Sequence, residues 1–204
     1  AMQDLDIRGA GNLLGAEQSG FITDMGFETY QKILAGAMEE LGVETGITTK
    51  STAESFISDC TIETDQLALI PDSYIELTAE KIRIYKELDS LTSEKELVSM
   101  RNRLTDRFGK MPMELERLFD IVRIRQLGKK LGFEKIIIKN GVMIAFFISN
   151  PLSQYYRSAR FSKVLENVNK NAKLFEVKQP DGRLRIIVRN VDSIARAHEI
   201  LKML

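Results

Sequence analysis

The chain has 204 residues, of which 44% are hydrophobic and 28% are charged, with 29 basic and 29 acidic side chains. This composition predicts a globular protein with one large domain, or with one ordinary domain and a tail, and excludes disordered, collagenous and coiled-coil proteins. No apolar run reaches the roughly 18 residues of a membrane span, and the N-terminus lacks the pattern of a signal peptide, so we expect a soluble, cytoplasmic protein without membrane contacts.

The charges are divided unevenly along the chain. Residues 1–60 hold three basic and ten acidic side chains, a balance of −7, so the other 144 residues carry +7. Such asymmetry suggests two pieces of different kind. A charge of +7 over 144 residues is, however, too dilute to identify a nucleic-acid surface.

The first 20 residues contain a glycine-dense loop. Residues 8–20 include four glycines, Gly9, Gly11, Gly15 and Gly20, and glycine at that density indicates a backbone that needs positive φ or close approach by another group. A phosphate-binding P-loop would need Lys-Ser/Thr after its last glycine, but Ala-Glu follows Gly15. The spacing also misses a dinucleotide fingerprint by one residue, so we expect neither ligand to bind in these ways.

The rest of the N-terminal third predicts one helix and a linker. Apolar residues recur at three- and four-residue steps over residues 27–41, which predicts an amphipathic helix that ends at Gly42. Residues 43–54 are rich in Thr, Ser and Gly and lack apolar periodicity, so they are interpreted as a linker. A second unit follows over residues 55–204.

The second unit begins with a strand and a helix. Residues 56–63 alternate weakly, which favours a strand, and a turn is expected at Pro71. A helix is expected from about Thr78 to Leu88. An alternative start lies earlier, where Ser73 and Glu76 could form a capping box.

Two further helices have clear boundaries. Ser93 and Glu96 form a capping-box pattern that predicts a helix ending at Gly109. Pro112 is expected in the first turn of the next helix, which ends at Gly132 as its C-terminal cap.

A unit of strand, turn, strand and helix occurs twice in the final third. Its alternating apolar residues predict an α+β fold in which helices cover one side of a small, mostly antiparallel sheet. Asn140-Gly141 is the strongest two-residue hairpin signal in the chain. The expected strands are residues 135–139 and 142–148, then 174–178 and 183–188 around Asp181-Gly182, with helices over residues 153–169 and 193–204.

Two groups of motifs carry a resemblance to known proteins. Residues 4–20, followed by Met25-Gly-Phe-Glu-Thr-Tyr, resemble the segment that closes the second motor domain of bacterial transcription-repair coupling factors, and a close version occurs in the RecG helicase family. Three later motifs resemble the C-terminal domain of the coupling factors, which RecG lacks. They are Ile70-Pro-Asp-Ser-Tyr-Ile, Arg83-Ile-Tyr-Lys-Glu-Leu and Leu104-Thr-Asp-Arg-Phe-Gly-Lys-Met-Pro.

The resemblance implies a division into parts. Residues 1–42 would be the tail of a RecA-like motor, residues 43–54 a linker and residues 55–204 a C-terminal regulatory domain. The glycine-dense loop would be the TRG motif, which links ATP-driven movement of the motor lobes to movement along duplex DNA. Its coupling residues fall on Arg8, Gly9, Gly11, Gly15 and Gln18. Gln3 stands where family members often have a basic residue.

The resemblance also implies partners. ATP and Mg²⁺ would be cofactors of the parent protein, a translocase that displaces stalled RNA polymerase, and not of this fragment, which has no catalytic residues. The regulatory domain would be an autoinhibitory lid on a UvrB-like N-terminal module that recruits UvrA. Basic residues on the helix before Gly132 could dock this module, could be solvated, or could bind DNA. The candidate docking residues are Arg117, Arg123, Arg125 and Lys129.

Other functions have weaker support in the sequence. A nucleic-acid module that used the C-terminal sheet would need exposed aromatic platforms, but Phe146 and Phe147 lie in an apolar run that looks buried. The single histidine, His198, has no identifiable acid–base partner, and the single cysteine, Cys60, resembles a small core residue. With one residue of each type, no disulfide and no metal site of Cys/His type is expected.

Overall fold

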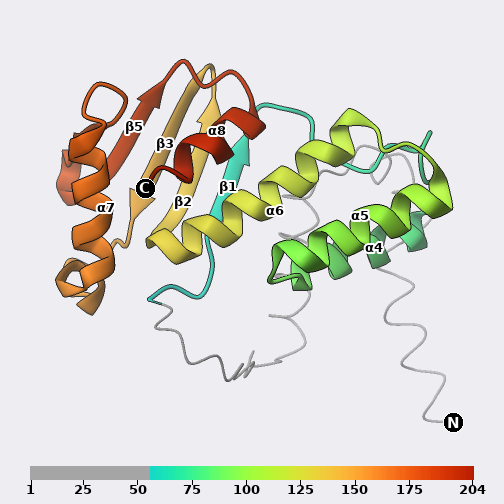
Figure 1. The fold of residues 1–204 in the computed structure, drawn as a ribbon, viewed down its shortest axis with the longest axis horizontal. Helices are drawn as coiled ribbons and strands as arrows, with labels where there is room; N and C mark the ends of the chain where they lie inside the picture. The colour runs from blue at the N-terminus through green and yellow to red at the C-terminus, as the bar shows by residue number, and fades with distance from the viewer. Residues whose placement is uncertain (1–55) are drawn as a thin grey trace, which may run out of the picture.

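A computed structural model describes residues 56–204, which form a five-stranded sheet with helices on one face (Figure 1). The strand order is β1-β2-β3-β5-β4. β1 pairs with β2 in parallel, and all other neighbours are antiparallel, which confirms the α+β class and the mostly antiparallel sheet. The strands are β1 (Thr61–Thr64), β2 (Phe133–Lys139), β3 (Val142–Phe147), β4 (Glu176–Lys178) and β5 (Arg185–Arg189).

The helices form two groups (Figure 1). α4 and α5 lie side by side away from the sheet, and the long helix α6 runs from them across the sheet, where α7 and α8 join it. The described helices are α4 (Thr78–Ser90), α5 (Glu94–Phe108), α6 (Met113–Leu131), α7 (Ala159–Lys170) and α8 (Ile194–Leu201), with short 3₁₀ turns η2 (Gln154–Arg157) and η3 (Pro180–Gly182).

Local signals set several of these boundaries as predicted. The Ser93 hydroxyl accepts a hydrogen bond from the backbone N–H of Glu96, and the Glu96 carboxylate accepts one from the backbone N–H of Ser93, so the capping box begins α5. Gly132 ends α6 with a φ of 85°, in the left-handed region that glycine adopts without strain. Asn140 and Gly141 both have positive φ in the turn between β2 and β3.

Other predicted boundaries were wrong. The expected strand over residues 56–63 is shorter and later, at β1. The alternative capping box of Ser73 and Glu76 does not begin a helix, because α4 starts after Leu77. Pro112 is the N-cap residue of α6 and not part of its first turn.

The predicted helix over residues 153–169 is two elements, η2 and α7. Ser158 separates them with extended backbone, and its hydroxyl accepts from the backbone N–H of Phe161 to cap α7. The break lets Tyr155 enter the core, where its hydroxyl donates to the carbonyl of Leu131. The cap at Ser158 and the burial of Tyr155 therefore account for two short elements where one continuous helix was predicted.

One face of the sheet packs against α6, α7 and α8. Alternate residues of its strands face these helices and are buried there, and the ring of Phe147 contacts that of Phe161 on α7 with centroids 5.5 Å apart. α6 crosses β2 and β1 at Gly128, where a Cβ atom would lie 2.6 Å from the Sγ atom of Cys60. The buried residues of this face include Ile62, Phe133, Ile136, Ile138, Met143, Ala145, Phe147, Ile186 and Val188.

The other face of the sheet carries the alternate side chains. No helix among residues 56–204 packs on it (Figure 1). Phe146 lies on this face and is half-buried, whereas Phe147 is buried on the helix face. The expectation that both rings are buried was therefore wrong for Phe146.

Candidate functional site

The predicted coupling residues lie outside the described residues. Their proposed role rests on the sequence, and the division into residues 1–42, 43–54 and 55–204 has the same status. These residues are Arg8, Gly9, Gly11, Gly15 and Gln18.

Arg123, a predicted docking residue, joins α6 to the start of α5. Its Nε and Nη2 atoms donate to both carboxylate oxygens of Glu94 at 2.7–3.0 Å, and its Nη1 donates to Asp120 at 2.9 Å. These hydrogen bonds raise the pKa of Arg123, and the guanidinium in turn lowers the pKa of Glu94. Only 16% of the Arg123 side chain is exposed. Its charge is therefore already neutralised within the domain.

Arg125 makes a second clamp on the same helix. Its Nε and Nη2 donate to the two carboxylate oxygens of Asp59 at 2.6 and 2.7 Å, and Nη1 donates to Asp89 at the end of α4. Burial lowers the pKa of Arg125, but the hydrogen bonds to Asp59 and Asp89 outweigh it and leave the pKa above its ordinary value. Arg125 thus ties the segment before β1 to α4 through α6.

The other two predicted docking residues, Arg117 and Lys129, differ from Arg123 and Arg125 in their contacts. Arg117 donates to the carbonyl of Leu67 at 3.3 Å and lies against the Sδ atom of Met113. No salt bridge joins Arg117 or Lys129 to a carboxylate among residues 56–204. The two flanking apolar side chains, Leu67 and Met113, are 57% and 64% exposed. Two of the four docking candidates, Arg123 and Arg125, therefore bind carboxylates of the domain. The other two, Arg117 and Lys129, are half-buried and form no salt bridge with residues 56–204.

The three arginines of α5 are also paired. Arg101 contacts Glu116 on α6, whereas Arg103 and Arg107 contact two carboxylates of α4. The sequence does contain a signal for the second pairing, because Glu80 and Glu87 are seven residues apart and so lie on one helical face. Antiparallel packing of α4 and α5 then places Glu87 and Glu80 opposite Arg103 and Arg107.

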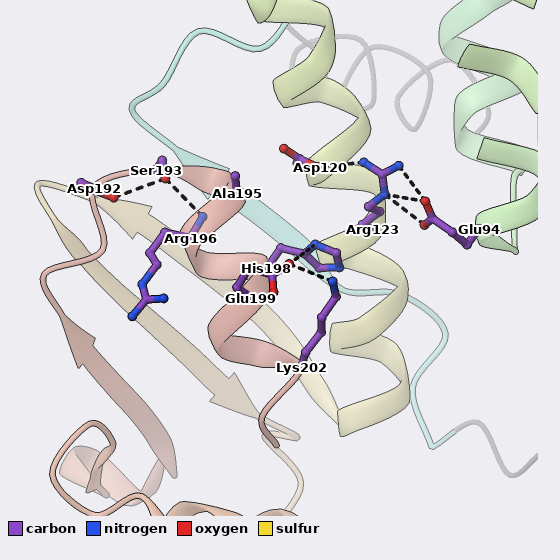
Figure 2. Close-up of a pocket in the computed structure, with 10 residues that line it drawn as sticks. All are labelled: Glu94, Asp120, Arg123, Asp192, Ser193, Ala195, Arg196, His198, Glu199 and Lys202. Atoms are coloured by element: carbon purple, nitrogen blue, oxygen red, sulfur yellow. Dashed lines mark hydrogen bonds and ion pairs between the residues drawn. The ribbon is translucent and has the colours of Figure 1, made fainter. Parts of the chain in front are cut away.

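An open cleft of about 870 Å³ lies between α8 and the α5–α6 pair (Figure 2). Its walls mix charges of both signs, with Lys202 and Glu199 paired at 2.8 Å. Its single histidine, His198, has its pKa lowered by burial and then by Lys202, and its Nδ1 lies 4.0 Å from Glu199. The lining residues are Glu94, Asp120, Arg123, Asp192, Ser193, Ala195, Arg196, His198, Glu199 and Lys202.

Two observations concern metal binding and nucleophilic chemistry in the described part of the chain. No group of three or more His, Cys, Asp or Glu side chains among residues 56–204 could hold a metal ion. Burial, then the charge of Asp59, raises the pKa of Cys60 to about 12. The thiol therefore stays protonated at neutral pH and is a poor nucleophile.

Residues 56–204 contain no helix that combines the length and apolar character required to cross a bilayer.

The chain is similar to named proteins over most of its length. The TRCF domain family matches residues 64–158. A Transcription-repair-coupling factor of Staphylococcus epidermidis is 37% identical over 191 residues, which cover 93% of this chain and 15% of that protein. One from Rickettsia typhi is 33% identical over 204 residues, which cover 98% of this chain and 17% of that protein. The chain thus spans about 15% of the length of the first of these relatives.

A solved structure has a similar fold. It is a crystal structure of the C-terminal domain of transcription-repair coupling factor, with a TM-score of 0.58 and 18% sequence identity. The match covers 73% of this chain and 92% of that one. At 18% identity this structure shows only that the fold is similar. Membership of the family rests on the sequence matches to the named coupling factors. The chain belongs to the transcription-repair coupling factor family and corresponds to the C-terminal part of these proteins.

Proposed function

We propose that the chain is the C-terminal part of an ATP-dependent DNA translocase, which displaces stalled RNA polymerase and recruits UvrA for nucleotide excision repair in the cytoplasm. The observation that carries this proposal is the 33–37% identity to named coupling factors over 93–98% of the chain. ATP and Mg²⁺ would bind elsewhere in the parent protein. This part would supply a coupling loop and a protein-docking domain.

The coupling role is assigned to Arg8 and Gln18 in the glycine-dense loop. A guanidinium can hold a bidentate partner in one motor state and release it in the other, and an amide offers both a donor and an acceptor. Replacing either residue with Ala in the parent protein should leave ATP binding largely intact and impair translocation, measured as displacement of a triplex-forming strand. Normal displacement by both variants would remove these residues from the mechanism.

The docking role is assigned to Arg117 and Lys129, because Arg123 and Arg125 already bind carboxylates of the domain. The proposed partner is the UvrB-like module of the same protein, so that docking covers its UvrA-recruiting surface. The double variant Arg117→Glu, Lys129→Glu in the parent protein should raise UvrA affinity without ATP. Lys130→Glu is a matched control, because this residue is exposed on the same helix. Unchanged UvrA affinity in the double variant would contradict the docking role.

A nucleic-acid module remains a second candidate because of one observation. Phe146 is half-buried on the open face of the sheet, and its neighbours across the strands are Lys135 and Arg185. A ring between two cations could stack on a base. A titration with single-stranded DNA tests this function separately from the UvrA measurement.

A further inference from the structure

The open face of the sheet has an ordered pattern of side chains. Three strands supply nine residues in register, which form three rows. The middle row is apolar throughout, and each outer row has an apolar residue on β3 between two cations. The rows are Lys139–Val142–Arg189, Ile137–Ile144–Ile187 and Lys135–Phe146–Arg185. The face is therefore an apolar cross with four basic corners.

The apolar cross lies outside the hydrophobic core. Its five members neither belong to the core cluster nor pack against it among the described residues. Four of them are half-buried, and Ile187 keeps 9% of its surface exposed. A contiguous apolar patch with a polar rim is the anatomy of a protein interface. A sheet with helices on one face can accept another element on its other face. The open face therefore has the features of a surface on which a further element packs.

The charges of the rim are incompletely balanced. Glu63 on β1 contacts Lys135 and Lys139, and Glu176 on β4 contacts Arg189. Glu176 also pairs with Lys178, which lies beside Arg185. Among residues 56–204 the four corner cations and Lys178 therefore share these two carboxylates, which leaves an excess of positive charge. A partner must therefore carry carboxylates along its edges.

Arg185 shows the clearest vacancy among the corners. Its Nε atom is shielded from solvent and has no hydrogen-bond partner among residues 56–204, although a buried guanidinium donor ordinarily has one. Its guanidinium carbon lies 5.8 Å from the centroid of the Phe146 ring, so the group is held beside the apolar cross. The Arg185 side chain as a whole is half-buried, so an incoming carboxylate would reach the guanidinium from its exposed side.

The dimensions of the cross match one helix. Strand β3 places Val142, Ile144 and Phe146 along about 13 Å, since alternate residues are about 6.6 Å apart. An α-helix covers this length with about nine residues. The basic corners on β2 and β5 are separated by two strand spacings, about 10 Å, which is close to the diameter of a helix with its side chains.

We propose that the open face of the sheet docks an acidic amphipathic helix of a partner protein. Apolar residues of that helix at three- and four-residue steps cover Ile144 and its neighbours, and carboxylates on its two edges bind the basic corners. A nucleic acid fits less well, because sheet-based readers present two or three aromatic rings. Phe146 is the only aromatic residue of the nine, and the centre of the face is isoleucine. This surface is separate from Arg117 and Lys129, so the inference goes beyond the proposed docking role.

The probe is a fluorescent 14-residue peptide in which leucines recur at three- and four-residue steps between glutamates, and the counter-probe replaces every glutamate with lysine. The 204-residue chain should bind the acidic peptide, at least about tenfold more tightly than the basic one at low salt. Ile144→Asp and Arg185→Glu should each weaken binding about tenfold or more. Lys163→Glu, a charge reversal on an exposed residue of α7, should change affinity less than about twofold. Amide spectra establish that each variant is folded.

Other results would overturn the proposal. These are equal binding of both peptides, binding of neither, or binding that Ile144→Asp and Arg185→Glu leave unchanged. Tighter binding of a twelve-nucleotide oligothymidine that Phe146→Ala abolishes would assign the face to nucleic acid. Dimerisation that Ile144→Asp abolishes in sedimentation equilibrium would assign it to a second copy. A change in the amide shifts of Ile144 caused by Leu34→Asp would assign it to the expected N-terminal helix of the same chain.

Discussion

On the covered face of the sheet, Ile136, Met143 and Val188 face α6, α7 and α8 and expose essentially no surface. Their neighbours Ile137 and Ile144 point the other way and lie outside the core. The cations follow the same division. Arg123 and Arg125 on α6 bind carboxylates, whereas the Nε atom of Arg185 on the open face has no hydrogen-bond partner in the described part of the chain.

This difference separates stability from binding. Charges on the helical side hold α4, α5 and α6 together, because Arg103, Arg107 and Arg125 each reach a carboxylate on a neighbouring helix. Charges on the open face surround an apolar patch that contributes little to the core. Substitutions on the two sides should therefore differ in kind, and the following predictions test that difference in order of expected effect.

The largest contrast is between two neighbouring positions of the sheet. Ile136→Asp places a carboxylate without a partner in the core and should cost about 4 kcal/mol or more of unfolding free energy, enough to unfold many domains. Ile144→Asp should cost about 1 kcal/mol, because water reaches the open face. Urea denaturation followed by circular dichroism measures both. Comparable losses would mean that the open face is covered within the chain itself.

The second contrast is between two arginines. Arg125→Met keeps an apolar stem but leaves Asp59 and Asp89 without their shared cation, and should cost about 2–3 kcal/mol. Arg185→Met loses mainly its contact with Phe146 and should cost less than about 1 kcal/mol. Lys129→Met on the same helix as Arg125 is the control and should be near neutral. If urea denaturation showed a larger loss of unfolding free energy for Arg185→Met than for Arg125→Met, Arg185 would be the arginine that stabilises the fold, contrary to this prediction.

The third prediction concerns how closely α6 approaches the covered face. Gly128→Ala would bring a Cβ atom within 2.6 Å of the Cys60 Sγ and 3.1 Å of the Ile136 Cδ1. The overlap should cost about 1–2 kcal/mol net, although alanine favours a helix over glycine by about 1 kcal/mol. Cys60→Ala removes the Sγ atom, so the double variant should be more stable than the sum of the single effects by about 1 kcal/mol. A stabilising Gly128→Ala would show that the helix and the sheet have room to separate.

Short-range chemistry explains which parts of the fold could be predicted. The capping box of Ser93 and Glu96, the turn at Asn140-Gly141 and the cap at Gly132 each depend on neighbouring residues, and each was predicted correctly. The break at Ser158 was not, because a continuous apolar pattern hides a residue that caps the next helix through its own hydroxyl. The parallel pairing of β1 with β2 joins residues 74 positions apart, such as Thr61 and Lys135, and no local pattern reports it.

The candidate surfaces were harder to predict because they depend on partners across the fold. The sequence shows Arg125 as a cation on a helix, but Asp59, 66 residues away, becomes its partner only after packing. The exposure of Phe146 could have been predicted. Successive strand residues point to opposite faces, so the assignment of Phe147 to the helix face already placed Phe146 on the other. The alternating sequence pattern does not show whether a helix packs on that second face, because such packing depends on residues far away in the chain.

The smallest expected effect concerns His198 in the cleft of Figure 2. Burial, then the charge of Lys202, lowers the pKa of this imidazole below its ordinary 6.5. The unfolded chain therefore binds the proton more readily than the folded one. The stability that neutral His198 contributes is complete above pH 6.5 and is lost as the pH falls through the folded pKa. His198→Gln should flatten this part of the curve of unfolding free energy against pH.

Because His198 is the only histidine of the chain, its imidazole signals give a single titration curve by NMR. The midpoint should lie below 6.5 and should rise in Lys202→Gln, which removes a nearby positive charge. Asp120→Asn should move it further down, because the Asp120 carboxylate favours the protonated ring. These opposite shifts would place His198 between the charges of α6 and α8. A midpoint at or above 6.5, or a midpoint unaffected by both variants, would contradict this prediction. It would mean that water in the cleft screens the charges of Lys202 and Asp120 from His198.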